Sequence, residues 1–116
     1  VFCLKKKKHT NKKNNSSITN NPSLTSLNVW SLFYGSSDKL WIGTYGQGLK
    51  ELDIKTNKLK SWKVDNPDFK TASFNYVKTI AEDNECNIWI GFWSAVLARL
   101  NPADGHLDHW RIRGFT

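Results

Sequence analysis

The sequence of 116 residues lacks several features that define large classes of protein. It contains no Met and begins with Val1, which predicts an excerpt or a processed product of a longer chain. No apolar run approaches the roughly 18 residues that a membrane-spanning helix needs. Val1–Leu4 is also too short to be the apolar region of a complete signal peptide. We therefore expect no membrane span and no complete targeting segment in this sequence.

Cysteine is scarce as well. Cys3 and Cys86 are the two cysteines, and their spacing matches neither a metal site nor a redox motif. This excludes a disulfide-rich scaffold, and we interpret each side chain as a free thiol without an assigned role. The cysteines leave the redox compartment of the protein open.

Acidic residues are absent before Asp38, whereas six lysines lie before residue 14. The other 11 basic side chains are nearly balanced by ten acidic ones, so six of the seven net positive charges belong to this segment. Residues 5–23 are almost entirely Lys, Asn, Ser and Thr, which predicts a disordered, solvated tail. The alternatives are that the lysines bind an anionic membrane surface or nucleic acid, and nucleic-acid binding would weaken steeply with salt. We do not expect it, because the run lacks interleaved aromatic residues.

The sequence also lacks the apolar periodicity of a helix. It contains an internal repeat instead. Residues 28–62 align with residues 76–110 at an offset of 48 without a gap. Eight positions are identical, including two Trp pairs and the tripeptide Trp-Ile-Gly, which chance rarely supplies. The identical pairs are Val29/Val77, Trp41/Trp89, Ile42/Ile90, Gly43/Gly91, Leu49/Leu97, Leu52/Leu100, Leu59/Leu107 and Trp62/Trp110.

Each copy of the repeat predicts four short strands separated by turns rich in Gly, Asn, Asp and Ser. Side chains alternate between two sides of these strands, with Leu40 and Ile42 on one side and Trp41 and Gly43 on the other, as in a half-buried strand. The predicted strands are Val29–Tyr34, Leu40–Tyr45, Leu49–Ile54 and Leu59–Lys63, then Val77–Glu82, Ile88–Trp93, Leu97–Asn101 and Leu107–Arg111.

Four antiparallel strands that recur after about 40–50 residues are typical of β-propeller blades. We therefore predict an all-β fold: two four-stranded antiparallel blades of a β-propeller, an incomplete ring, preceded by the disordered tail. The expected boundaries are residues 1–23 for the tail, 24–63 and 76–111 for the blades, 64–75 for the connection between them and 112–116 for the start of the next connection.

The repeat resembles that of the two-component regulator propeller family. The resemblance extends over residues 21–111, and its most specific motif is Trp-Ile-Gly-Thr followed by Gly-Leu in the first copy. The second copy departs from the family where Phe92–Val96 replaces Thr44–Gly48. Since its glycines are lost there, we expect a wider or re-packed hairpin. The similar segments are residues 21–29, 31–34, 40–53 and 56–59, then 77–84 and 87–91.

The resemblance implies a role. Propellers of this family form the sensor part of bacterial hybrid two-component receptors, lie in the periplasm or elsewhere outside the cytoplasm, and commonly respond to glycan fragments. It follows that the partners are neighbouring blades of the same parent chain or further copies of this chain, with an oligosaccharide as ligand. The alternative is a fragment of a lyase-type propeller enzyme whose catalytic residues lie in blades outside this sequence.

The aromatic residues divide into two groups. Those at equivalent repeat positions are interpreted as packing residues. Four others differ between the copies and lie near strand ends, where a ring can present an apolar face to the C–H groups of a sugar; packing is the competing interpretation for each of them. The repeat residues are Trp41, Ile42, Gly43, Trp62, Trp89, Ile90, Gly91 and Trp110, and the ligand-binding candidates are Trp30, Tyr45, Phe92 and Trp93.

Titratable residues give no catalytic pattern. His106 and His109 are three residues apart, so on a strand they face opposite sides and do not share a metal. Glu82 and Asp83 precede a turn, and an Asp at that place bonds to its own backbone, so we assign the pair to turn formation. We expect no catalytic, metal-binding or cofactor-binding residue, and no cofactor, in this segment.

Overall fold

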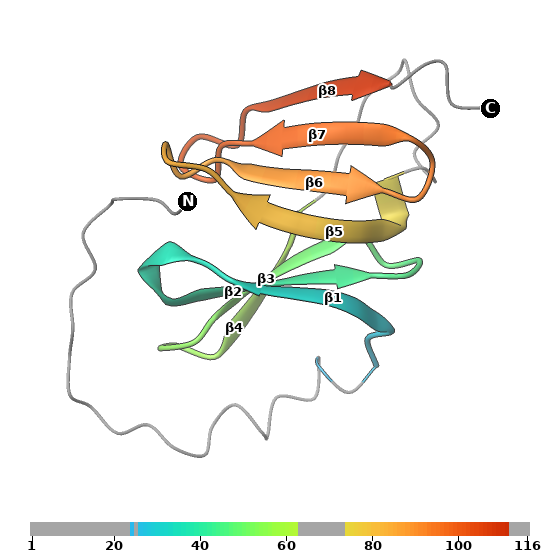
Figure 1. The fold of residues 1–116 in the computed structure, drawn as a ribbon. Coiled ribbons are helices and arrows are strands. Elements are labelled where there is room, and N and C mark those ends of the chain that lie inside the picture. Colours follow the sequence, from blue (N-terminus) through green and yellow to red (C-terminus); the bar gives the residue numbers. More distant parts are fainter. Residues whose placement is uncertain (1–23, 25, 63–73, 112–116) are drawn as a thin grey trace.

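The computed structural model describes residues 24, 26–62 and 74–111, which form two four-stranded antiparallel sheets packed against each other (Figure 1). We call the first sheet blade 1 and the second blade 2. In each blade the strands are adjacent in chain order. The strands are β1 (Val29–Tyr34), β2 (Lys39–Thr44), β3 (Leu49–Asp53) and β4 (Lys58–Trp62), then β5 (Val77–Glu82), β6 (Ile88–Phe92), β7 (Val96–Leu100) and β8 (Leu107–Arg111).

The all-β fold with two antiparallel blades is confirmed, and each strand begins and ends within one residue of its predicted bounds. Within the described part of the chain, no helix has the length and hydropathy of a membrane span. The predicted tail of residues 1–23, residues 64–73 of the predicted connection and residues 112–116 lie outside the described residues.

The two blades share turn chemistry as well as strands. The Asp53 carboxylate accepts a hydrogen bond from Lys55 N at 2.9 Å, and the Asn101 amide oxygen accepts one from Ala103 N at 3.0 Å at the equivalent place. These side chains mimic a backbone turn, which is why Asp and Asn are interchangeable there. The same turn requires a left-handed residue, supplied by Asn57 in blade 1 (φ 60°). The repeat therefore specifies its turns through side-chain hydrogen bonds.

The core lies between the blades. Trp41 on β2 is 2% exposed and packs with apolar residues of blade 2. Gly43 lies two residues further along the same strand. A Cβ atom at Gly43 would lie 2.6 Å from Val77 Cγ1, so the absence of a side chain lets β5 approach β2 closely. The core residues are Trp41, Leu49, Phe74, Val77, Ile80, Ile88, Ile90, Phe92, Val96, Ala98 and Leu100.

Equivalent positions of the repeat differ in exposure. Val77 and Ile80 of β5 are 0% and 9% exposed, because blade 1 covers them. Their counterparts Val29 and Leu32 of β1 are 45% and 60% exposed. Among the described residues, blade 1 therefore has no neighbour on the side where blade 2 has blade 1, as expected for two blades of an incomplete ring.

The opposite side of the pair is open too. Trp89 and Trp110 stack on the outer face of blade 2, with ring centroids 5.7 Å apart and planes 13° apart. The Arg99 guanidinium lies over both rings, 5.4 Å and 5.6 Å from their centroids. Trp110 is 43% exposed, whereas the equivalent Trp62 packs against the core between the blades.

Of the two alternatives expected for the hairpin of blade 2, the wider loop is wrong and a re-packed loop is found. Three residues separate β6 from β7, whereas four separate β2 from β3. Ala95 adopts the left-handed conformation (φ 59°) that Gly46 and Gly48 adopt in blade 1. Because one non-glycine residue takes this conformation, β7 begins one residue earlier, and Val96 pairs with Arg111. Loss of the glycines thus shortens the loop.

Candidate functional site

Four aromatic residues from both blades meet at one end of the sheets, and we call them the aromatic cluster. Trp30 belongs to β1, Tyr45 follows β2, Tyr76 precedes β5 and Trp93 follows β6. The Trp30 ring centroid is 5.1 Å from that of Tyr45 and 5.3 Å from that of Trp93. Tyr45 is 4.7 Å from Tyr76 and 5.8 Å from Trp93. The rings therefore form one continuous surface across the junction of the blades.

Backbone pairing holds this junction together. Tyr45 and Tyr76 form an isolated antiparallel bridge between the two sheets. Next to it, Gly46 N donates a hydrogen bond to Asn75 O at 2.9 Å, and Trp93 N donates one to Tyr76 O at 3.0 Å. Main-chain bonds thus fix the backbone of three of the four cluster residues, Tyr45, Tyr76 and Trp93.

Equivalent β-bulges place Trp30, the fourth residue of the aromatic cluster, and Lys78, a charged residue that contacts the cluster. The pairing register shifts between Val29 and Ser31 in blade 1, and between Val77 and Thr79 in blade 2. Bulges re-aim side chains and are common beside binding sites. The bulged residue is Trp30 in β1 and Lys78 in β5, and these two strands, the first of each blade, lie side by side (Figure 1).

The cluster is open to solvent. Trp30 is 52% exposed, Tyr45 44% and Trp93 43%. These fractions are large for aromatic side chains, which contribute most to stability when they are buried. The Lys78 ammonium lies 5.0 Å from the centroid of the Trp93 ring, within the range of a cation–π contact. The end of the molecule that carries the cluster therefore presents an apolar surface with a positive charge beside it.

The structure brings three of the four predicted ligand-binding candidates together and separates the fourth. Phe92 is 5% exposed and packs edge-on against Phe74, with centroids 5.1 Å apart in the core between the blades. As the last residue of β6 it faces blade 1, whereas Trp93 begins the loop and faces solvent. Sequence reasoning did not name Tyr76 or Lys78, although both differ from their counterparts in the first copy, as the named candidates do.

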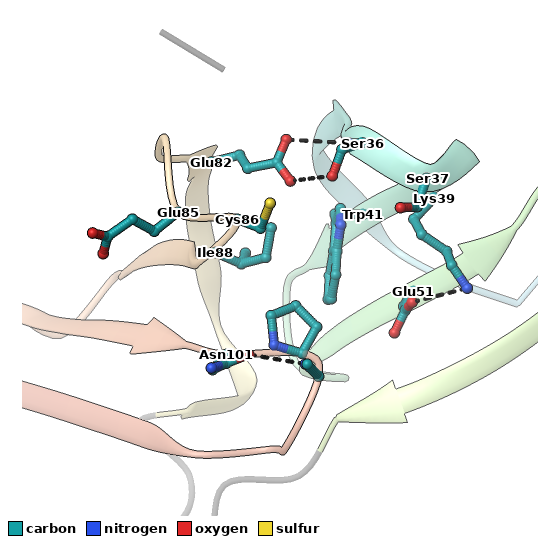
Figure 2. A pocket seen from close by; sticks show the side chains of 12 residues that line it. Ser36, Ser37, Lys39, Trp41, Glu51, Glu82, Glu85, Cys86, Ile88 and Asn101 are labelled. Atoms are coloured by element: carbon teal, nitrogen blue, oxygen red, sulfur yellow. Dashed lines mark hydrogen bonds and ion pairs between the residues drawn. The ribbon is translucent and has the colours of Figure 1, made fainter. Parts of the chain in front are cut away.

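A pocket of about 350 Å³ lies between the blades near the turns that join β1 to β2 and β5 to β6 (Figure 2). Figure 2 shows the Glu82 carboxylate of blade 2 directed toward Ser36 of blade 1. One carboxylate oxygen accepts a hydrogen bond from Ser36 Oγ at 2.7 Å, and the other accepts one from Ser36 N at 3.1 Å. This bidentate contact links the blades at the pocket rim.

A second carboxylate of the pocket is also engaged. Glu51 accepts a hydrogen bond from Trp62 Nε1 at 2.7 Å, and its other oxygen lies 3.5 Å from the Lys39 ammonium. Lys39 also donates to Asp53 at 3.1 Å. Partial burial lowers the pKa of Lys39, but the bond to Asp53 and the nearby Glu51 outweigh it, so the pKa is raised. The charges of the pocket wall thus hold strands together.

Asp83 forms a turn as predicted, but Glu82 has a different role. Asp83 accepts hydrogen bonds from Glu85 N and Asn87 N, each at 2.9 Å, and from Trp89 Nε1 at 2.8 Å. Burial raises the pKa of Asp83, and the bonds from Trp89 and Asn87 outweigh this, so its pKa is lowered. Glu82 instead reaches the other blade, a contact between residues 46 positions apart that no local motif indicates.

The interpretation of Cys86 as a free thiol is wrong, because this residue is disulfide-bonded. It lines the pocket between the blades (Figure 2). Cys3, the other cysteine of the chain, lies outside the described residues. Cys86 belongs to no cysteine motif, so the sequence gave no signal of its bond, since spacing predicts connectivity only within dense frameworks.

The histidines of the described region have protein partners. His106 Nε2 lies 3.0 Å from Asp108, which also bonds to Arg99 at 2.5 Å. The hydrogen bond from Arg99 lowers the pKa of Asp108. The His109 ring contacts that of Phe74. Over residues 24, 26–62 and 74–111, no group of three or more His, Cys, Asp or Glu side chains is arranged to hold a metal ion.

The comparisons with known proteins agree with the repeat. A family model described as two component regulator propeller matches residues 23–46 and residues 71–94. The two matches are offset by 48 residues, as the internal repeat is, and each covers the first two strands of a blade. No curated protein matches the chain. Each blade thus contains one match to the two component regulator propeller model, and the chain is similar to that family over these residues.

Proposed function

We propose that this chain is part of the extracytoplasmic sensor propeller of a bacterial two-component receptor, and that it responds to glycan fragments through the aromatic cluster. The observation that carries the proposal is the exposed surface formed by Trp30, Tyr45 and Trp93 where two propeller blades meet. A regulator propeller needs a ligand-contacting surface, and this one combines residues of both repeats.

The chemistry of the cluster suits carbohydrate. The exposed faces of aromatic rings pack against the C–H groups of a pyranose, while Tyr hydroxyl and Trp N–H groups supply polar contacts at the edges. Trp30 and Tyr45 are inclined by 34°, and Trp93 stands nearly perpendicular to both, so the surface is angular rather than flat. The backbone bridge between Tyr45 and Tyr76 limits the ordering cost of binding.

The disulfide bond of Cys86 supports a location outside the cytoplasm. Disulfides persist in the periplasm and in secreted proteins, and are rare where thiol-reducing systems operate. The bond is therefore what a sensor exposed to an oxidising compartment would carry.

We further propose that this segment binds without catalysing a reaction. Glu82 is bonded to Ser36, Glu51 to Trp62, and Asp83 to the atoms of its own turn. A general acid or base needs a group that can reach the substrate proton. These carboxylates are committed to holding strands and blades, which favours a sensor over an enzyme.

The test is a calorimetric titration of the full chain with a panel of neutral and acidic oligosaccharides, using the Trp30→Ala and Trp93→Ala variants. Trp110→Ala is the matched control, because Trp110 has the same 43% exposure as Trp93 but lies outside the cluster. We expect at least one oligosaccharide to bind, and each cluster variant to weaken it by about fivefold to tenfold while the control does not. Absence of binding by the whole panel, or an equal loss in the control, would contradict the proposal.

A further inference from the structure

We infer that the ligand of the aromatic cluster is an acidic oligosaccharide carrying a uronate carboxylate, and that Lys78 is the residue that selects it. This inference rests on the proposed function, since it names the chemical class of ligand for the same surface. It follows from the position of Lys78, from the distribution of charge over the described residues, and from the contact between Lys78 and Trp93.

Charge is distributed unequally between the two ends of the blades. Across the described residues, no carboxylate lies in the loops that join β2 to β3 or β6 to β7, where the cluster is built. All eight described acidic residues lie in the turns at the opposite end or on the strands next to them. They are Asp38, Glu51, Asp53, Glu82, Asp83, Glu85, Asp104 and Asp108. A carboxylate bound at the cluster therefore meets no like charge nearby among the described residues.

Lys78 is the cation at the edge of this surface. It is exposed, and it forms no ion pair with any carboxylate of the described residues, whereas Lys39 and Arg99 each have an acidic partner. Its counterpart in the first repeat is Trp30, and both residues occupy the bulge in the first strand of their blade. The Trp30 ring of one blade and the Lys78 ammonium of the next both contact the ring of Trp93.

The contact between Lys78 and Trp93 also gives the aromatic rings different roles in the binding that we propose. Because the ammonium lies over the Trp93 ring, 5.0 Å from its centroid, that face is already occupied by a cation. Sugar stacking is then left to Trp30 and Tyr45, while Trp93 holds Lys78 in place. The carboxylate of a uronate projects from the rim of the pyranose. An ammonium beside the stacking rings can therefore donate to it a charge-assisted hydrogen bond.

The experiment compares uronate oligosaccharides with their methyl esters, which keep the sugar stereochemistry and remove the charge. Galacturonate, glucuronate and mannuronate oligomers, each with its ester and a neutral analogue, are titrated into the full chain at low and moderate salt. We expect the best uronate to bind about fivefold more tightly than its ester, with a difference that shrinks as salt is added.

Variants then identify the cation. Lys78→Gln should remove the preference for the uronate over its ester, and Lys78→Arg should keep it. Lys60→Gln is the matched control, because Lys60 also lies over a Trp ring, 3.8 Å from the centroid of Trp62, but away from the cluster. Equal binding of uronate and ester to the wild-type chain, or a preference that survives Lys78→Gln, overturns the inference and leaves the proposed function standing. If no oligosaccharide binds, charged or neutral, the proposed function itself fails.

Discussion

The Gly43→Ala substitution tests whether the two blades pack as tightly as the structure shows. A Cβ atom at this position would clash with Ser31 Oγ of the same blade and with Val77 Cγ1 of blade 2 at 2.6 Å, and it would lie tightly against Val77 Cβ at 3.2 Å. Val77 is fully buried on the facing blade, so it has no space into which to move. The side chain of Ser31, which is half-buried, can rotate to relieve its own clash, but the clash with Val77 is relieved only by shifting β5 away from β2, which loosens the core between the blades.

The expected effect is a balance of two terms. Overpacking a filled core costs about 1–3 kcal/mol. Replacing Gly by Ala on extended backbone returns about 0.4–1 kcal/mol, because the unfolded chain loses freedom. We therefore expect Gly43→Ala to lower the free energy of unfolding by about 1–2 kcal/mol. Urea unfolding followed by tryptophan fluorescence measures this value, since Trp41 lies in the affected core.

Gly91→Ala is the matched control at the equivalent repeat position. The nearest atom to its added Cβ is Thr79 Cγ2 at 2.7 Å, a clash of similar severity. Thr79 is exposed and lies in the same blade, so its side chain can rotate into solvent. We expect a change within about 0.5 kcal/mol of wild type. Equal destabilisation by the two variants, or none by Gly43→Ala, would refute the proposed packing of blade 1 against blade 2.

Three further substitutions test contacts at the opposite end of the blades. Asp83→Asn should lower stability by about 1 kcal/mol at neutral pH, because it weakens the bond to Trp89 Nε1. Since folding lowers the pKa of Asp83, its stabilising effect is present above the unfolded value of about 3.9 and is lost as pH falls through the folded pKa. The melting temperature of wild type should therefore drop more between pH 6 and pH 3 than that of the variant; parallel curves would exclude this role. Ser36→Ala should cost about 1 kcal/mol in urea unfolding by removing the hydroxyl bond to Glu82, and an unchanged midpoint would show that the link contributes nothing. Reductant should lower the melting temperature of wild type but not of Cys86→Ser, and equal responses would exclude a stabilising disulfide.

The sequence was sufficient for the strands and turns because these depend on local signals. Asp53 and Asn101 bond to backbone atoms two residues away, so a short motif predicts their turns. The alternation along Leu40–Gly43 likewise predicts which side of β2 each residue occupies. Both features depend on residues that are close in the sequence, and each feature occurs in both copies of the repeat.

The contacts between blades could not be predicted in this way. Ser36 and Glu82 are 46 positions apart, and neither belongs to a motif. Exposure also depends on what neighbours a blade has. Trp62 and Trp110 are identical in the repeat, yet Trp62 packs against the core between the blades while Trp110 stays 43% exposed. A repeat alone does not determine which copy of a residue is covered.

The positions where the two repeats differ are the ones that build the site. Trp30 and Lys78 occupy equivalent bulges in consecutive blades, and both contact the ring of Trp93. Two lysines there would repel each other, and two tryptophans would provide no charge. One of each gives a stacking surface with a cation at its edge. Tyr45 and Trp93 are also equivalent positions that differ between the copies. Each follows the second strand of its blade, and their ring centroids lie 5.8 Å apart. Identical residues such as Trp41 and Trp89 maintain the blade, whereas the recognition that we propose depends on positions at which the two copies differ and which meet at the junction of the blades.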